Sequence, residues 1–346
     1  MKCAHALNAA LARVLESDPR ALVFGEDVID PYGGAFKVTR GLSTRFPGRV
    51  RATPVSEAAI VGLATGLSLR GYKPIVEIMF GDFLLLAADQ IVNHAAKFRA
   101  MYGGHVSCPL VIRTPSGGGR GYGPTHSQSL EKHLFGVPHL HSFAASVFHD
   151  PLLLFTHMLS LHGPSLFIEH KLMYGAEMWD SQGASPALAR WPCDSGAAIP
   201  AARLAAVPPA ECRVTLVAYG HQAAVAATVV ERLAIEQEIF VDLIVPAQLA
   251  PLDLAPIVES GRCTGCVVTV EEGTAGWSWG SEIAARVQAE LFGLLRRPVA
   301  VLTSNSDVIP ASRSAEADML ISPARIRHML EEVCHDAGGG AAARRQ

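Results

Sequence analysis

Several classes of protein are excluded by what the sequence lacks. No window approaches the roughly 18 uninterrupted apolar residues that a membrane-spanning helix needs. The net charge is −3 and no long basic run occurs, so the electrostatic footprint of a nucleic-acid-binding protein is missing. Residues 1–16 form an Ala/Leu stretch interrupted by polar residues, which favours an amphipathic surface helix over a signal peptide. We therefore expect a cytoplasmic protein whose partners are proteins and small molecules.

Cysteine is scarce and irregularly spaced. The chain has 7 cysteines, an odd number at scattered positions, which argues for reduced thiols rather than a disulfide framework. Cys263 and Cys266 have the CxxC spacing of redox and zinc sites, but they lead directly into a strand-like run at residues 267–270. No second CxxC or nearby histidine completes a zinc site, so we interpret the spacing as coincidence.

What the sequence does contain is a regular alternation of short β-branched runs with longer helical patterns. This alternation is typical of the α/β fold class, and the length of 346 residues suits two domains, each a mostly parallel sheet flanked by helices. The predicted strands are residues 22–25, 74–79, 109–113, 165–169, 214–219, 240–245, 267–271 and 299–303, and helices are predicted at 56–69, 221–233 and 281–294.

The domain boundaries follow from changes in composition. Residues 178–209 are rich in Ala, Pro, Ser and Gly, as expected of a linker between a first domain at 1–177 and a second at 210–335. Residues 336–346 are Gly, Ala and Arg for the most part, and we expect them to form a flexible tail.

The helix predicted at residues 56–69 opens on a Ser-Glu pair. Ser56 is a plausible N-cap and Glu57 falls in the first turn. An acidic residue there is favoured by the helix macrodipole alone. The local sequence thus leaves open whether Glu57 is a helix-start residue or a functional carboxylate.

Several ordered motifs give the sequence a family resemblance. Between Thr53 and His133 it reads TPVSEAAIVGLATGLSLRGYKPIVEIMFGDF, then AADQIVNHAAKF, then RTPSGGGRGYGPTHSQSLEKH, with GEDV upstream and FIEHKLMYG downstream. This first half resembles the pyrimidine-binding domain of the β subunits of thiamine-diphosphate-dependent 2-oxo acid dehydrogenases. The later motifs VAYG, LIVPAQLAPLD, VTVEEG and GWSWGSEIA are similar to the transketolase-type C-terminal domain of the same family.

The resemblance implies thiamine diphosphate as cofactor and gives Glu57 a role. Glu57 matches the family glutamate that hydrogen-bonds the cofactor's pyrimidine ring and shifts it to the tautomer that removes the thiazolium proton. Phe83 matches the aromatic residue that stacks on this ring, and the alternative is an ordinary core phenylalanine.

Two more residues have roles by resemblance. His126 follows a glycine-rich loop and matches the family histidine at the active-site entrance, where an imidazole moves protons near neutral pH. Glu26 matches a family acidic residue near the subunit interface that couples the two active sites, and the resemblance counts it among the cofactor-binding residues, although a plain strand-end carboxylate explains it nearly as well.

The glycine-rich loop has neither nucleotide fingerprint, GxGxxG or GxxxxGK[ST]. The chain also lacks the Gly-Asp-Gly segment with a downstream Asn that binds magnesium and the diphosphate in this family. The resemblance therefore implies an α subunit that holds the magnesium and shares the thiamine diphosphate, in an α₂β₂ heterotetramer.

The implied reaction is decarboxylation of a 2-oxo acid and transfer of the acyl fragment to a lipoyl group. Two departures from the family leave points open. Leu161 and Gly163 stand where the family places the Asp and Asn of a monovalent cation site, and residues 304–320 differ from a family segment that contacts the acyltransferase core. The alternatives are a split transketolase-like or acyloin-forming enzyme, and a non-catalytic scaffold of the same fold.

Overall fold

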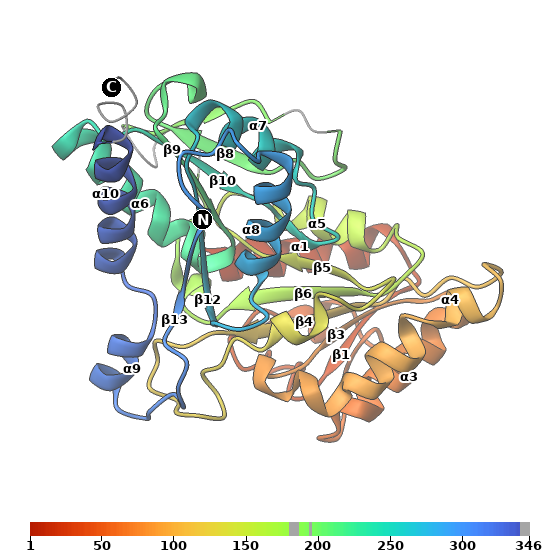
Figure 1. Cartoon of the computed structure of the whole chain (residues 1–346). Coiled ribbons are helices and arrows are strands. Elements are labelled where there is room, and N and C mark those ends of the chain that lie inside the picture. The colour runs from red at the N-terminus through yellow and green to blue at the C-terminus, as the bar shows by residue number, and fades with distance from the viewer. Residues whose placement is uncertain (180–186, 194–195, 340–346) are drawn as a thin grey trace. The chain divides into compact units, whose positions relative to one another are not determined.

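The computed structural model describes residues 1–179, 187–193 and 196–339, and the chain divides into two compact units (Figure 1). The first unit comprises Met1–Met178 with Gln248–Pro251, and the second comprises Trp179–Ala247 with Leu252–Gln346. Each is an α/β unit with a mostly parallel sheet flanked by helices, which confirms the predicted fold class.

The sheet of the first unit has 7 strands in the order β11-β5-β6-β4-β3-β1-β2. All neighbours pair in parallel except β11 and β5. Its strands are β1 (Ala21–Gly25), β2 (Val50–Ala52), β3 (Lys73–Glu77), β4 (Val111–Ser116), β5 (His141–Ala144), β6 (Ser165–His170) and β11 (Gln248–Ala250). The inner strands are buried along their length, as expected of a parallel sheet covered on both faces.

Helices cover both faces of this sheet (Figure 1). The helix α1 (Cys3–Ser17) packs beside α5 (Pro151–Met158) on one face, and α3 (Glu57–Leu69) lies on the other. Ile60, Val61 and Ala64 of α3 pack into a core with the apolar residues of β3 and β4. Shorter helical segments are α2 (Leu42–Arg45), α4 (Phe98–Met101), η1 (Gly81–Ala87), η2 (Gln90–Ala95), η3 (Glu131–Leu134) and η4 (Met173–Gly175).

The second unit is built on a sheet of 6 strands in the order β13-β12-β9-β10-β8-β7. The strands β7 and β8 run antiparallel to their neighbours and the rest are parallel. The strands are β7 (Ala189–Trp191), β8 (Ala202–Ala205), β9 (Val214–Ala218), β10 (Val241–Val245), β12 (Val267–Thr274) and β13 (Ala300–Ser304). The helical elements are η5 (Pro209–Glu211), α6 (Gly220–Gln237), α7 (Ala255–Thr264), α8 (Trp279–Glu290), α9 (Arg313–Met319) and α10 (Pro323–Gly339).

The predicted strands and helices are all present, with ends shifted by a few residues. Of the stretch expected to be a linker, residues 189–191 and 202–205 form the short strands β7 and β8. They lack the long β-branched run by which the other strands were predicted, so they could not be predicted from composition alone. The proposed domain boundaries stay predictions. The expected tail lies partly outside the described residues, and the part that is described, to Gly339, continues α10.

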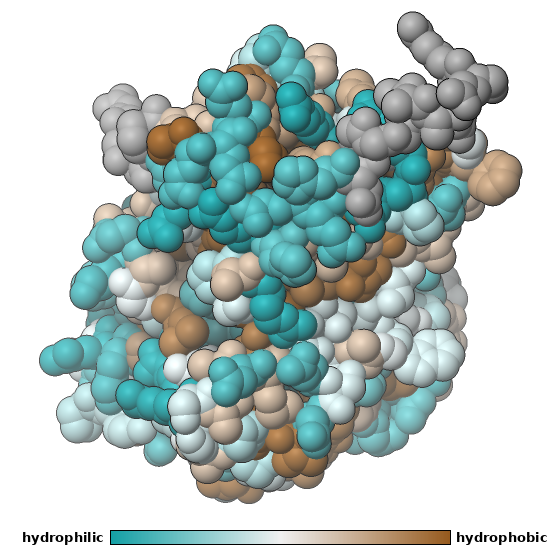
Figure 2. Space-filling model, turned by 60° about the vertical axis from the view of Figure 1, so that its left-hand side comes forward, coloured by the Kyte–Doolittle hydropathy of each residue, from teal (hydrophilic) through white to brown (hydrophobic). Residues whose placement is uncertain are grey.

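The cysteines form no disulfide, as expected from their number and spacing. The 7 cysteines are all free, and the CxxC pair is split between α7, which carries an exposed Cys263, and a buried Cys266 just before β12. None of the described helices combines the length and apolar character needed to span a membrane. Figure 2 shows one face of the molecule, on which polar residues predominate and apolar residues form small groups.

Candidate active site

The four residues singled out from the sequence lie at one edge of the first sheet. Glu26 follows β1 directly, Phe83 lies in η1 after β3, and His126 lies in the loop after β4. These strands are neighbours and parallel, so their carboxyl ends meet at the same edge. Glu57, which begins α3 after β2, joins them there. In open parallel sheets this edge is where ligands bind.

Glu57 is held at the first turn of α3. The Ser56 side chain accepts a hydrogen bond from the Ala59 backbone N–H at 3.4 Å, which confirms Ser56 as the N-cap. Glu57 is 6% exposed, and its carboxylate receives no hydrogen bond from the residues that the structure describes. Because the rest of the side chain is covered and the carboxylate makes no hydrogen bond within the described residues, the carboxylate is available to a group that binds from outside the chain.

Glu26 is the second buried carboxyl at this edge, with 5% of its surface exposed. Burial raises its pKa, the negative charge of Glu57 raises it further, and a hydrogen bond from the Ser56 backbone partly opposes both. The Glu26 Oε1 atom is buried without a partner among the described residues. Burial and the neighbouring carboxyl group thus make Glu26 easier to protonate than a free glutamate.

Phe83 and His126 are brought together by the fold. Their rings meet edge to face with centroids 5.3 Å apart, and Phe80 contacts both, at 5.8 Å from Phe83 and 5.0 Å from His126. The hydroxyl of Thr125 lies 3.0 Å from His126 Nδ1. Phe83 and His126 are both half-buried, so the cluster presents aromatic surface and an imidazole at the same edge.

A buried ionic network, which was not predicted from the sequence, lies within the same sheet. Arg113 Nε donates to Glu169 Oε1 at 2.8 Å, and the guanidinium also bonds Glu77, its neighbour in register on β3. Tyr174 Oη donates to Glu169 Oε2 at 2.7 Å. Burial raises the pKa of Glu77 and the charge of Arg113 opposes it. A charged residue next to apolar residues in each of three strands was the feature of the sequence that could have indicated this network.

This network supports the aromatic cluster. The Tyr174 ring stacks on Phe36 with centroids 5.0 Å apart, and Phe36 in turn contacts Phe80 at 6.0 Å. The ion network thus fixes Tyr174, and Tyr174 supports the ring of Phe80 through Phe36. Phe80 in turn contacts His126.

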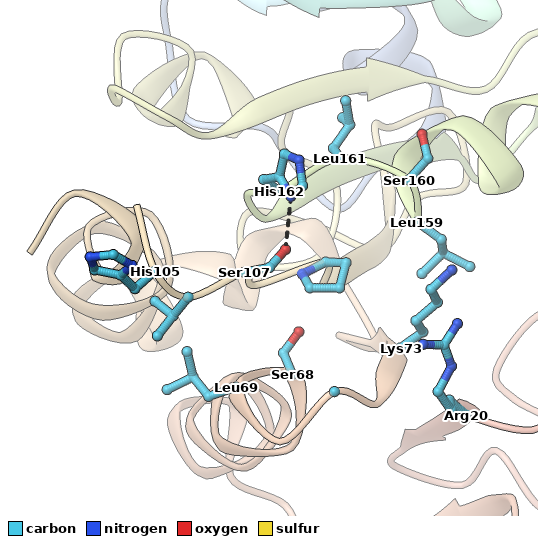
Figure 3. A pocket seen from close by; sticks show the side chains of 13 residues that line it. Arg20, Ser68, Leu69, Lys73, His105, Ser107, Leu159, Ser160, Leu161 and His162 are labelled. Carbon is cyan, nitrogen blue, oxygen red and sulfur yellow. Dashed lines mark hydrogen bonds between the residues drawn. The ribbon is translucent and has the colours of Figure 1, made fainter. Parts of the chain in front are cut away.

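A cavity of about 430 Å³ lies at the opposite edge of this sheet (Figure 3). Its lining includes Lys73, the first residue of β3, and His162, whose Nδ1 lies 3.2 Å from the Ser107 hydroxyl. The basic groups of Arg20 and Lys73 there are both ion-paired with Asp18. None of the residues predicted from the sequence lines this cavity, so it is separate from the candidate site.

Comparison with known proteins gives the family. The transketolase pyrimidine-binding domain matches residues 1–176, and the transketolase C-terminal domain matches residues 205–326. The 3-methyl-2-oxobutanoate dehydrogenase subunit beta of Mycobacterium tuberculosis is 34% identical, over 95% of this chain and 90% of the relative. The pyruvate dehydrogenase E1 component subunit beta of Leifsonia xyli is 36% identical, over 85% of this chain and 83% of the relative. The chain belongs to the β-subunit family of the 2-oxo acid dehydrogenases.

A solved structure agrees with this at the level of the fold. The chain described as "Split gene transketolase, inactive beta4 tetramer" superimposes with a TM-score of 0.72 at 22% identity, over 95% of this chain and 97% of the other. Membership of the β-subunit family confirms the resemblance inferred from the ordered motifs, and with it the implied use of thiamine diphosphate and of an α partner.

Two family motifs of the second unit, VTVEEG and GWSWGSEIA, contact each other in the structure. Glu271 of VTVEEG accepts hydrogen bonds from the backbone N–H groups of Trp279 at 3.1 Å and Gly280 at 2.6 Å, which open α8. A Cβ atom at Gly280 would lie 2.3 Å from Thr269 Oγ1, so glycine is required there. The carboxylate therefore satisfies orphan donors at a helix start that must pack closely on β12.

Proposed function

We propose that this chain is the β half of a thiamine-diphosphate enzyme that decarboxylates a 2-oxo acid and passes the acyl fragment to a lipoyl acceptor. One observation carries the proposal: the carboxylate of the mostly buried Glu57, unpartnered within the described residues, lies at the same sheet edge as the Phe83–His126 cluster. Family membership supplies the chemistry that this arrangement suits.

The residues fit the cofactor. The aminopyrimidine ring of thiamine diphosphate has an aromatic face and ring nitrogens, and when bound the cofactor supplies a nucleophilic carbon that stabilises the charge left by decarboxylation. Glu57 would hold a ring nitrogen by a hydrogen bond, and Phe83 would contact the ring face. The raised pKa of Glu26 favours a proton on that group, which would reduce its repulsion with Glu57, and the Glu57 carboxyl group would exchange a proton with the ring.

His126 would serve the acceptor. An imidazole can donate or accept a proton near neutral pH, and this one is held by ring contacts with Phe80 and Phe83 while remaining half-exposed. The surrounding aromatic rings reduce the access of water to the reacting groups, which limits hydrolysis in competition with transfer.

An α subunit would complete the site in an α₂β₂ heterotetramer. The sequence lacks the family's magnesium and diphosphate segment, so those ligands would come from the α chain. Apolar side chains next to the site support a partner surface: Val55 is 80% exposed, Leu63 is 55% exposed and Leu86 is 62% exposed. All three belong to the segments that carry Glu57 and Phe83, and exposed apolar side chains next to a site suit a surface that a partner covers.

The test uses the purified complex of this chain with its α partner, supplied with thiamine diphosphate, magnesium and a panel of 2-oxo acids. Release of carbon dioxide with acylation of a lipoylated protein is the expected result. Product formation that needs an aldehyde or ketose acceptor, and leaves the lipoyl group untouched, would establish the transketolase-like or acyloin-forming alternative. A complex that binds its partner but turns over none of these substrates would establish the scaffold.

A further inference from the structure

The loop that carries His126 is tied to the turn that carries Phe83 by one buried carboxylate. Asp82 Oδ1 accepts a hydrogen bond from the Gln128 backbone N–H at 3.0 Å and another from Gln128 Nε2 at 3.0 Å. Asp82 is the neighbour of Phe83, and Gln128 stands two residues after His126. Both bonds therefore fix the end of the loop relative to the aromatic residue.

Lys171 holds the other end of the same loop. Its Nζ donates to the carbonyl oxygen of Gly117 at 2.7 Å and lies 3.8 Å from Asp82 Oδ2. Its own carbonyl oxygen accepts a bond from Arg120 at 2.8 Å, and its ammonium group lies 5.4 Å from the centre of the Phe80 ring. One lysine thus contacts the loop twice and the aromatic cluster once.

The loop needs such anchors because its backbone is intrinsically free. Gly117, Gly119, Gly121 and Gly123 all have positive φ, between 72° and 85°, in a segment where glycine offers many alternative conformations. Without ties at both ends, His126 would be spread over many positions. Its contacts with Phe80 and Phe83 would then be occupied for only part of the time.

The ties are made of buried charges, which stability alone does not explain. The side chain of Lys171 is 0% exposed and that of Asp82 is 2% exposed. A buried ion pair is seldom better for stability than apolar residues of the same volume, whereas it defines geometry sharply. The Asp82–Lys171 pair lies between the loop and the turn that carries Phe83, and this position suits a role in placing His126.

We propose that Asp82 and Lys171 are positioning residues that hold the His126 imidazole against Phe80 and Phe83. The proposal rests on the proposed function only in assigning His126 to the acceptor step. The tie between the loop and the turn is a property of the chain itself, and it can be measured without turnover.

The first test measures amide hydrogen exchange over residues 117–128 in the purified chain. Asp82→Asn weakens both bonds to Gln128, and Lys171→Met removes the bond to Gly117. Charge-assisted hydrogen bonds of the usual strength predict about a 10- to 100-fold faster exchange in the loop for either variant. Asp18→Asn and Lys73→Met form the matched control, because this pair, 3.2 Å apart, lies at the opposite sheet edge. Unchanged loop exchange in Asp82→Asn would overturn the proposal.

The second test uses the assembled enzyme with its α partner. In Asp82→Asn, we expect exchange of the thiazolium proton to stay within about 3-fold of wild type, while transfer to the acceptor falls by about 10-fold or more, as for a displaced acid-base group. Adding Asp82→Asn to Lys171→Met should restore part of the stability lost in Lys171→Met, because no uncompensated charge remains. Equal losses in both half-reactions would show a general structural role and overturn the assignment.

Gln128→Ala keeps every buried charge and removes only the Gln128 Nε2 bond, so it serves if the charge variants fold poorly. A several-fold rise in loop exchange, with a selective loss of transfer, is expected, and no change in either measurement would count against the proposal. If the wild-type complex shows no cofactor activation, the proposed function fails, whereas faster loop exchange in the variants would still establish the tie.

Discussion

The buried carboxyl groups of Glu26 and Glu57 lie close enough for the charge of Glu57 to raise the pKa of Glu26, in addition to the larger effect of burial. The two groups come from different segments, one from the end of β1 and one from the start of α3. This edge of the sheet therefore has a carboxyl group that is easier to protonate than a free glutamate next to a second carboxyl group, a pairing that acid-base sites use.

This pair predicts how stability depends on pH. Because the pKa of Glu26 is higher in the folded chain than its ordinary value of 4.5, the stability it contributes is present below that value and lost as pH rises through the folded pKa. Glu26→Gln should therefore be more stable than wild type at pH 8, and the gain should vanish near pH 4. Urea unfolding at both values measures this. Glu290→Gln, at an exposed position, is the control and should show no such gain. A Glu26→Gln variant less stable than wild type at pH 8 would contradict the prediction.

Replacing Arg113 should destabilise the first unit strongly. Arg113→Met leaves the buried carboxylates of Glu77 and Glu169 without their counter-ion, and breaking a buried ion pair in this way costs about 3–5 kcal/mol. Tyr174→Phe, which removes only the hydroxyl bond to Glu169, should cost about 1–3 kcal/mol. Chemical denaturation compares the two variants. A loss below about 1 kcal/mol for Arg113→Met would show that the network is dispensable for stability.

The sequence was sufficient to predict the fold class and most of its strands and helices. Short apolar runs make parallel strands recognisable in a sequence. The residues that follow β1, β3 and β4 lie at one edge because these strands are parallel neighbours. Ser56 and Glu57 could be placed at a helix start because a capping residue precedes an apolar repeat.

Contacts between distant segments could not be predicted in this way. The bonds from Gln128 to Asp82 and from Lys171 to Gly117 join residues 46 and 54 positions apart, and nothing in their local sequence indicates a partner. Arg113 was visible as a charge in an apolar strand, but its two acidic partners depend on strand order and register. The short strand β8 depends on pairing with β10, and β7 depends on pairing with β8, rather than on their own composition.

His126→Ala should slow the acceptor half-reaction by about 10²-fold or more, the usual contribution of a positioned acid-base group, and should leave cofactor activation nearly unchanged. The reason is its position: His126 contacts Phe80 and Phe83, whereas no hydrogen bond or ion pair joins it to Glu57 among the described residues. Single-turnover measurements with an artificial oxidant and with the natural acceptor separate the two steps. The loss of ring contacts should cost about 0.5–1.5 kcal/mol of stability. A similar loss with both oxidants would argue against an acceptor role.

The chain alone should bind thiamine diphosphate weakly or not at all. Glu57 and Phe83 offer contacts to the pyrimidine, but the ligands of magnesium and diphosphate are absent from the sequence. Calorimetric titration of the purified chain with cofactor and magnesium should show no binding in the micromolar range, and the complex with the α partner should show it. Micromolar binding by the chain alone would mean that a diphosphate site has been overlooked.

The carboxylate of Glu57 is the group on which the proposed chemistry depends most. In Glu57→Gln the side chain is nearly isosteric and can still form a hydrogen bond with a ring nitrogen. An amide is, however, a very poor acid and base, so it cannot exchange a proton with the ring. Cofactor binding by the assembled enzyme should survive while exchange of the thiazolium proton slows by about 10²–10⁴-fold, the range for a positioned acid-base group, which corresponds to about 3–5 kcal/mol of barrier. Stability should change little, because Gln loses about 0.3–1 kcal/mol of helix-dipole stabilisation but also removes the repulsion with Glu26.

The measurement is hydrogen–deuterium exchange at the thiazolium carbon in the complex with the α partner, followed by acid quench and NMR. Glu290→Gln, the same substitution at an exposed position in the second unit, is the control and should exchange at the wild-type rate. Calorimetry on both variants establishes that the cofactor is bound, so that slow exchange reports chemistry rather than occupancy. If Glu57→Gln binds the cofactor and also exchanges at the wild-type rate, Glu57 is a helix-start residue, and its burial at this edge has another cause.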